Sequence, residues 1–437
     1  MQCGKNSESI HYSLKYSNEW DQVYDYILKN WSETIVKNKD LPEPFLAPWK
    51  KSPTFFYFDN YFINKGALEV DSLSIYAKNA VGNAIFLINK FGFVPNFNDK
   101  MGENRSQSPY LSMMVRDIYT HFRGKDTVWL RQAYIALLKE YKFWTDATED
   151  AIENHRTTIA YLQHYGQHAS KEELISFYNR VLPGRLGINY NTLTDDEKAK
   201  VAAPYIAEAE AMDFTPRFDR RAPDFAAVDL NSNLYLYERN FVWIEKILGI
   251  KNKVDWRKRA EKRKEQIRKY LWNKDRGLFM DYDYKDNQFG KIACITSVSP
   301  LYAGIATKSQ AKEFVNNLPL FEFKYGVSIC EENKYLSATA FQFDYPVSWA
   351  AFTVLTIMGL DRYGYKKQAR QIAEKFLDVV TKNFFDPIPK QSGHNLYEKY
   401  NAVNGHIDGA GYGYGLNKFF GFTAGGFVWC YNYVKKG

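Results

Sequence analysis

The sequence is poor in the residues and patterns that mark several large protein classes. It has only four cysteines, Cys3, Cys294, Cys330 and Cys430, and no pair has the CxxC spacing of zinc or redox motifs. Its seven histidines show no HExxH or paired spacing, and the glycine-rich stretch 405–415 is not followed by the GK[ST] of a phosphate-binding loop. We therefore expect no metal and no cofactor.

Long apolar runs and blocks of charge are missing as well. No stretch of about 18 apolar residues occurs, which predicts that nothing spans a membrane. The net charge of +8 comes from 58 basic and 50 acidic residues scattered along the chain, which argues against a nucleic-acid partner. The chain also lacks a βαβ rhythm and any repeat of about 20–50 residues, so we expect neither a dinucleotide-binding fold nor a solenoid.

The N-terminal residues give a prediction about location. Residues 1–16 are polar, and we expect a flexible segment there, ahead of one domain over 17–437. They lack the apolar core of a signal peptide, but Cys3 followed by Gly4 resembles the mature start of a bacterial lipoprotein. The expected location is periplasmic or lipid-anchored after signal removal, with the cytoplasm as the alternative, and we expect a monomer.

Aromatic residues, in contrast, are abundant. They make up 17% of the chain, as 33 Tyr, 31 Phe and 10 Trp. A thick aromatic core is one interpretation. Sugar binding is the other, because the C–H faces of a pyranose pack on aromatic rings.

Helical periodicity dominates the chain. Apolar residues recur at helix intervals in twelve segments: 17–35, 73–91, 109–123, 127–147, 171–182, 225–248, 254–273, 294–306, 309–316, 342–359, 364–383 and 416–435. Twelve helices can pair into six hairpins, so we predict an all-α fold, an (α/α)6 toroid with two concentric rings. The polar connections 92–108, 183–224 and 384–415 are too long to be mere connectors, and we expect them to frame a pocket.

Three carboxylates in these surroundings are candidates for glycoside hydrolysis, which needs two carboxyl groups flanking the scissile bond. Asp213 lies between apolar neighbours, Glu398 lies between two tyrosines, and Asp344 shortly precedes a proline. Simpler roles remain open at this point. Asp213 and Asp344 are also suited to be N-caps, and Glu398 to pair with Lys399 at the surface.

Six segments, in the same order as in the trehalase family, resemble its motifs: PNFNDKMGENRSQSPYLSMMV (95–115), AMDFTPRF (211–218), VDLNSNLYLYER (228–239), GLFMDYDY (277–284), FQFDYPVSWA (341–350) and LYEKYNAV (396–403). The family counterparts are PNGNRSYYLNRSQPP, GWDFSSRW, VDLNALLYKYER, GxFxDYD, QWDxPxGWAP and MVEKYDV. Six ordered matches are far more specific than any one of them.

The resemblance implies an inverting α,α-trehalase with a small saccharide as its substrate. By position, Asp213 becomes the general acid and Glu398 the general base. Inversion predicts that their carboxyl groups lie roughly 6.5–9.5 Å apart. The substrate-binding residues that the resemblance implies are Phe58, Asp59, Asn96, Arg105, Gln107, Arg217, Asp344 and Trp349. The glycine-rich stretch 405–415 matches the family's lid, and we expect it to close over the sugar.

The chain also departs from the family pattern. The stretch FLAPWKKSPTFF (45–56) lacks the Gly-Gly-Arg of the first signature, and 160–180 has no clear counterpart of the RPES segment. These groups shape sugar binding more than proton transfer. Two alternatives therefore stay open: another (α/α)6 α-glucosidase, acting on glucosylglycerate or an oligosaccharide end, and a carbohydrate-binding protein that has lost catalysis.

Overall fold

The computed structural model describes residues 16–186, 192–251, 253–333, 341–390, 394–407 and 418–436. The segment 1–15, which holds Cys3, and the greater part of the predicted lid, 408–415, lie outside these described residues. Within them, no helix is both long and apolar enough to cross a membrane.

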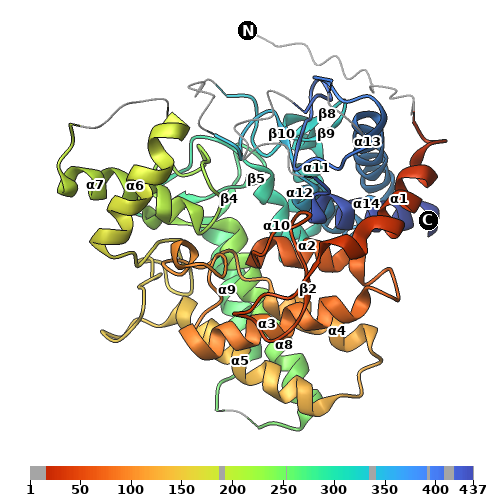
Figure 1. The fold of residues 1–437 in the computed structure, drawn as a ribbon. Coiled ribbons are helices and arrows are strands. Elements are labelled where there is room, and N and C mark those ends of the chain that lie inside the picture. The colour runs from red at the N-terminus through yellow and green to blue at the C-terminus, as the bar shows by residue number, and fades with distance from the viewer. Residues whose placement is uncertain are drawn as a thin grey trace.

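Twelve helices form an (α/α)6 toroid in the described part of the chain (Figure 1). The inner ring closes on itself, because each inner helix contacts the next and the last contacts the first. Its members are α2 (Tyr57–Ala67), α4 (Leu111–His121), α8 (Val228–Leu248), α10 (Ser299–Tyr302), α12 (Ala350–Arg362) and α14 (Gly421–Lys436). The outer helices alternate with them along the chain: α1 (Trp20–Asn30), α3 (Ser74–Phe91), α5 (Thr127–Thr145), α9 (Trp256–Tyr270), α11 (Lys308–Asn317) and α13 (Lys366–Phe385).

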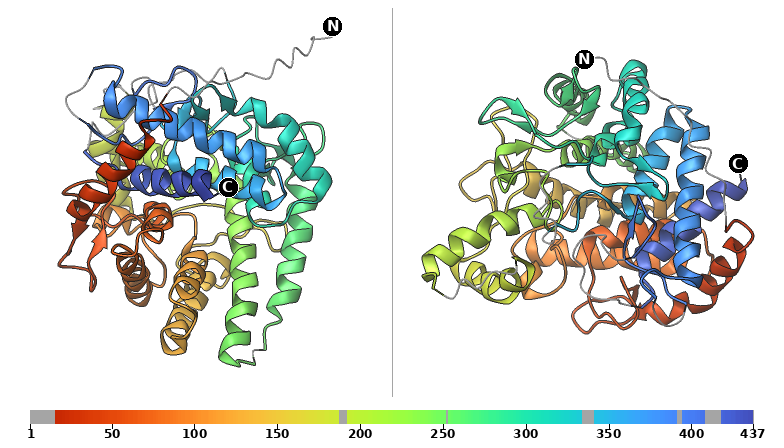
Figure 2. Two further views of the ribbon diagram at one scale, coloured as in Figure 1. Left: turned by 90° about the vertical axis from the view of Figure 1, so that its right-hand side faces the viewer. Right: turned by 90° about the horizontal axis from the view of Figure 1, so that it is seen from above.

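Burial distinguishes the two rings. The inner helix α12 is buried without a break from Ala350 to Ile357. The outer helix α9 buries Trp256, Ala260, Arg263 and Ile267, which form one stripe at helical spacing. The two adjoining helices α8 and α9 run side by side, green in Figure 2. The inner helix α12 is thus enclosed on all sides over these residues, whereas the outer helix α9 buries one face.

The ring closes where α14 packs against α2. A Cβ atom on Gly425 would lie 2.5 Å from the backbone oxygen of Phe62, and Gly66 faces Gly425 across the same contact. Only glycine allows backbones to approach this closely.

Two further helices lie outside the ring. α6 (Lys171–Leu186) packs on α7 (Asp195–Ala209), and the pair, yellow-green in Figure 1, is inserted between α5 and α8. Short 3₁₀ turns are η1 (Trp31–Thr34), η2 (Lys100–Gly102), η3 (Ala222–Asp224), η4 (Ile295–Val298) and η5 (Leu318–Leu320).

Two-residue strands brace the loops. Antiparallel pairs join β1 (Ile35–Val36) to β2 (Phe45–Leu46), β4 (Trp272–Asn273) to β5 (Leu278–Phe279), β8 (Glu322–Phe323) to β9 (Gly326–Val327) and β10 (Val347–Ser348) to β11 (Tyr400–Asn401). A three-stranded sheet consists of β3 (Phe225–Ala226), β6 (Tyr282–Asp283) and β7 (Gln288–Phe289), with β6 in the centre.

Loop length differs between the two ends of the toroid. Connections from an inner to the next outer helix are short: 68–73, 122–126, 249–255, 303–307 and 363–365. Connections from an outer to the next inner helix are long: 31–56, 92–110, 146–227, 271–298, 318–349 and 386–420. The long loops therefore gather at the N-terminal end of the inner helices.

The number of predicted helices equals the number in the ring, but the predicted segments do not all correspond to ring helices. α2 was not predicted, and segment 171–182, counted as a ring helix, is α6 of the inserted pair. The connection 183–224, predicted as a loop, contains α7, and the helix predicted over 342–359 begins only at Ala350. The segment predicted over 73–91 is confirmed as α3, which ends at Phe91 with Gly92 as its C-cap at a φ of 87°.

Candidate active site

The predicted site residues come from different loops that meet at one end of the inner ring. Phe58 and Asp59 lie in the first turn of α2, and Gln107 lies just before α4. Asp213 precedes α8 in the third long loop, while Trp349 is the N-cap of α12. Glu398 lies between α13 and α14. Each of these residues stands in or at the end of an outer-to-inner connection.

The pKa of Asp59 indicates that three of the predicted carboxyl groups, those of Asp59, Asp213 and Glu398, lie near one another. Burial raises the pKa of Asp59 well above its ordinary value, and the negative charges of Glu398 and Asp213 raise it further. Both charges must be near Asp59 for this effect, so the predicted acid and the predicted base share one end of the toroid.

Asp213 lies in a setting that balances two effects. Burial raises its pKa, while the guanidinium groups of Arg105 and Arg185 lower it. Phe214 and Met212, its neighbours in sequence, are both buried. A carboxyl whose environment raises the pKa is suited to hold a proton until a leaving group needs it.

Arg185 was not predicted from the sequence. It lies on α6, with its guanidinium 4.4 Å from the ring centroid of Phe214, and its Nη2 donates to Gln342 Oε1 at 3.4 Å. The inserted helix pair thus delivers a cation to Asp213. Local sequence contained no signal for this, because α6 stands where the family's RPES segment found no match.

Lys399 contacts both Glu398 and the ring of Trp349. Lys399 Nζ lies 3.3 Å from Glu398 Oε2 and 5.2 Å from the ring centroid of Trp349. Burial lowers the pKa of Lys399, and Glu398 opposes that change. The Trp349 ring is stacked on Phe343 with centroids 4.3 Å apart, and its Nε1 donates to the Gln342 carbonyl at 3.2 Å.

The loop before α4 contributes polar residues in different ways. Gln107 Oε1 accepts a bond from Phe58 N at 2.8 Å, which fixes Gln107 to the start of α2. Arg105 Nη1 donates to Asn104 Oδ1 at 2.8 Å, and the positive charge of its guanidinium lowers the pKa of Asp213. Asn96 Nδ2 donates to the Ala209 carbonyl at 3.1 Å, so this amide ties the loop to the end of α7.

The ring of Phe58 belongs to an aromatic cluster at the same end. Its centroid lies 4.9 Å from that of Phe62, 5.8 Å from Tyr110 and 5.9 Å from Phe352. These residues come from α2, the start of α4 and α12, so Phe58 is positioned by three inner helices.

Arg217 is engaged away from the three carboxyls. Its guanidinium is 1% exposed and makes two bonds to Asp229, at 2.6 and 3.0 Å, and two to Asp281, at 2.5 and 2.7 Å. Planar guanidinium forks of this kind are strong anchors for carboxylates. The described contacts therefore make Arg217 the anchor that joins the Asp213 loop to α8, rather than a group turned toward a sugar.

Asp344 is similarly occupied by its own turn. Its Oδ1 accepts from Tyr345 N at 2.7 Å and from Asn333 Nδ2 at 2.8 Å. Burial raises its pKa, and these bonds oppose the rise. These bonds hold Asp344 in its turn, but they are not an N-cap, because α12 begins at Ala350 with Trp349 as its N-cap.

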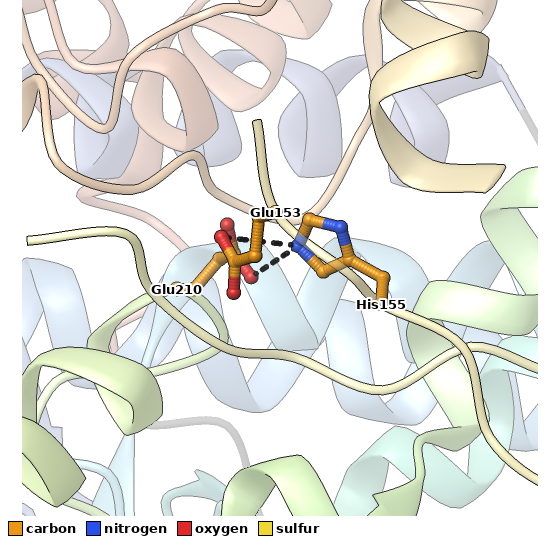
Figure 3. A group of neighbouring side chains, drawn as sticks. All are labelled: Glu153, His155 and Glu210. Carbon is orange, nitrogen blue, oxygen red and sulfur yellow. Dashed lines mark hydrogen bonds and ion pairs between the residues drawn. The ribbon is translucent and has the colours of Figure 1, made fainter. Parts of the chain in front are cut away.

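A buried cluster of Glu153, His155 and Glu210 supports the loop that contains Arg105 (Figure 3). His155 Nε2 lies 3.0 Å from Glu210 Oε2 and 3.4 Å from Glu153 Oε2. Burial alone would lower the pKa of His155, but the two glutamates outweigh it and raise the pKa to about 9. Glu210 also accepts from Ser106 N at 3.0 Å and Gly166 N at 2.8 Å. The possible metal-ligand atoms of the three side chains lie within 4.8 Å of one another, and the contacts above pair His155 with both glutamates.

With this geometry in place, comparison with known proteins identifies the family. The family model described as Trehalase matches residues 8–434. The chain belongs to the trehalase family. The six ordered motifs all lie within the residues that this family model matches.

The relatives include trehalases named as cytosolic and as periplasmic, and they are longer than this chain. The chain is 29% identical to the cytosolic neutral trehalase of Kluyveromyces lactis over 88% of this chain and 55% of that protein. It is 28% identical to the periplasmic trehalase of Xanthomonas oryzae over 88% of this chain and 67% of that protein. It thus spans about half the length of the yeast relatives that it matches.

Solved structures agree on the fold. Neutral trehalase Nth1 from Saccharomyces cerevisiae superposes with a TM-score of 0.73 at 24% identity, covering 94% of this chain and 80% of that one. A GH63 mannosylglycerate hydrolase from Thermus thermophilus gives a TM-score of 0.62 at 14% identity, covering 93% and 98%.

Proposed function

We propose that this protein is an inverting α,α-trehalase, which hydrolyses α,α-trehalose to two molecules of glucose. The observation that carries the proposal is electrostatic. The carboxyls of Asp213 and Glu398, from two separate loops, both raise the pKa of Asp59 at the end of the toroid where the long loops gather. Two carboxyl groups around one pocket are what glycoside hydrolysis requires.

In the proposed mechanism Asp213 is the general acid. Burial favours its protonated form, and that proton passes to the glycosidic oxygen as the bond to the leaving glucose breaks. Arg105 and Arg185 limit the rise in pKa and stabilise the carboxylate after the proton has left.

Glu398 is the proposed general base. Lys399 Nζ, 3.3 Å from Glu398 Oε2, is the cation that holds this carboxylate in place. The carboxylate removes a proton from a water molecule that attacks the anomeric carbon from the opposite face, which inverts the configuration there.

Substrate-binding roles follow for the neighbouring groups. Asp59 forms a hydrogen bond with a sugar hydroxyl, Gln107 and Arg105 supply donors, and the rings of Phe58 and Trp349 contact sugar C–H faces. Trp349 is only 4% exposed, so the edge of its ring makes that contact. Asn96, Arg217 and Asp344 support these groups through the bonds described above.

A glucose-release assay tests the proposal. We expect turnover on α,α-trehalose and much less on glucosylglycerate or short α-glucans. Asp213→Asn and Glu398→Gln should each lower kcat by about 10²–10⁴-fold or more, with sugar binding by calorimetry largely retained. Asp286→Asn, at an exposed carboxylate paired with Arg221, is the control and should leave kcat unchanged.

Other outcomes would change the assignment. Preference for glucosylglycerate or an oligosaccharide would make the protein a different α-glucosidase of this fold. Sugar binding without turnover on any substrate would make it a binding protein. Full activity in Glu398→Gln would refute the base assignment alone.

Organisation and location belong to the same proposal. We propose that residues 17–437 act as one catalytic unit, because a continuous apolar core runs from α1 to α14. We propose a monomer, which light scattering tests directly. Relatives include cytosolic and periplasmic trehalases, and a periplasmic or lipid-anchored location remains our preferred prediction.

A further inference from the structure

Two cysteines far apart in the sequence meet beside the site. Cys294 precedes η4 and Cys330 follows β9, 36 residues later. Their Sγ atoms lie 2.8 Å apart, and the two residues are 5% and 0% exposed. Both are free thiols in this structure.

Backbone register explains why they meet. Cys294 and Cys330 are partners in an antiparallel bridge. Hydrogen bonds flank them on both sides, from Ile295 N to the Ile329 carbonyl at 2.7 Å and from Glu331 N to the Ala293 carbonyl at 3.0 Å. This pattern defines a non-hydrogen-bonded pair, in which the Cα atoms lie about 4.5 Å apart and the side chains are closest. That separation falls inside the range of about 4.4–6.8 Å that disulfides span.

The pair ties together segments that support the site. Ile329, next to Cys330, donates its N–H to the Val347 carbonyl at 2.9 Å. Val347 and Ser348 form β10, which pairs with β11 at Asn401 and Tyr400, close to Glu398 in the chain. A covalent link at Cys294 would therefore brace the strands next to the proposed base and Trp349.

We propose that Cys294 and Cys330 form an intramolecular disulfide under oxidising conditions, and that this bond stabilises the loops around the site. The oxidant is a low-molecular-weight disulfide such as oxidised glutathione. The thiolate of one cysteine attacks it, forms a mixed disulfide and releases one glutathione thiolate. The second cysteine thiolate then attacks the protein sulfur and releases the other. The two protein thiols lose two protons and two electrons, and the oxidant's S–S bond becomes two thiols.

The order of attack follows from exposure. Cys294 is the more accessible of the two, and burial raises the pKa of Cys330 well above that of an ordinary thiol. Cys294 is therefore the first nucleophile and Cys330 the resolving one. Cys430, which is fully buried in α14, offers a matched control.

The test starts with the full chain incubated in oxidised glutathione or in dithiothreitol. Alkylation in denaturant followed by peptide mapping should find a peptide linking Cys294 to Cys330 only in the oxidised sample. The oxidised protein should unfold about 3–8 °C higher than the reduced one, because the bond closes a long loop in the unfolded chain. Cys294→Ser and Cys330→Ser should each abolish this difference, whereas Cys430→Ser should retain it.

Three results would overturn the proposal. The first is that both thiols remain alkylatable after prolonged oxidation. The second is a disulfide that joins either cysteine to Cys3 instead. The third is a Cys294–Cys330 bond with equal unfolding temperatures in the two samples. If a serine variant does not fold, the comparison of oxidised with reduced wild-type protein still decides the matter.

Discussion

Replacing Arg217 separates a structural anchor from a sugar-binding group. The side chain is 1% exposed and makes four bonds of 2.5–3.0 Å to Asp229 and Asp281. Arg217→Met would leave two buried carboxylates without their guanidinium partner, while Val228 N still donates to Asp281 and Leu230 N to Asp229. Removing one partner of a buried ion pair costs about 3–5 kcal/mol, so we expect a loss of that size in the free energy of unfolding.

Arg217→Lys refines the same prediction. Lysine keeps the positive charge but not the planar fork, so it cannot serve both carboxylates, and we expect a loss of about 2 kcal/mol. Urea unfolding at pH 7 measures these values. Arg239→Met is the control, because Arg239 is half-exposed and 3.8 Å from Glu261, and it should cost less than about 1 kcal/mol. Unchanged stability with a tenfold higher KM for trehalose would refute the anchor role and support direct sugar contact.

Two further predictions concern stability. The pKa of His155 is raised to about 9, so the stability that its positive charge contributes is fully present below about pH 6.5 and is lost as the pH rises through 9. We therefore expect the free energy of unfolding to fall by ~2 kcal/mol between pH 7 and 9. A flat profile in urea unfolding over this range would contradict the prediction. Gly425→Ala should cost about 1–3 kcal/mol in thermal unfolding because its Cβ would meet the Phe62 backbone at 2.5 Å, whereas Gly82→Ala, whose Cβ would meet only Glu43 Cγ at 3.6 Å, should be neutral or stabilising; equal effects would argue against the close α2–α14 contact.

Several ring helices were accessible to sequence reasoning because apolar residues recur along them at helical spacing, as the stripe of the outer helix α9 shows. α2 was missed for the opposite reason. It is an inner helix, and its residues Tyr57 to Ala67 mix aromatic and amide side chains that are almost all buried, so no stripe stands out. α7 was missed although Thr194 and Glu197 form a capping box that the sequence displays. The segment 341–349 has helical spacing, but pairing of β10 with β11 overrides it.

The motif order led to Asp213 and Glu398, but local patterns could not reveal which groups surround them. Arg185 reaches Asp213 only because α6 and α7 fold back as a pair. Arg217 finds Asp229 and Asp281 at sequence separations of 12 and 64, and their mutual burial is decided by tertiary packing. The motif identifies Arg217 as a candidate, whereas only the fold shows that it binds Asp229 and Asp281.

The most direct test of the account is proton NMR of the glucose released in the first moments of α,α-trehalose hydrolysis. Inversion acts at one anomeric carbon and leaves the other untouched, so we predict equal amounts of β- and α-glucose before mutarotation. Release of α-glucose alone would show a retaining enzyme and contradict the roles proposed for Asp213 and Glu398. No release of glucose from trehalose would contradict the trehalase activity itself.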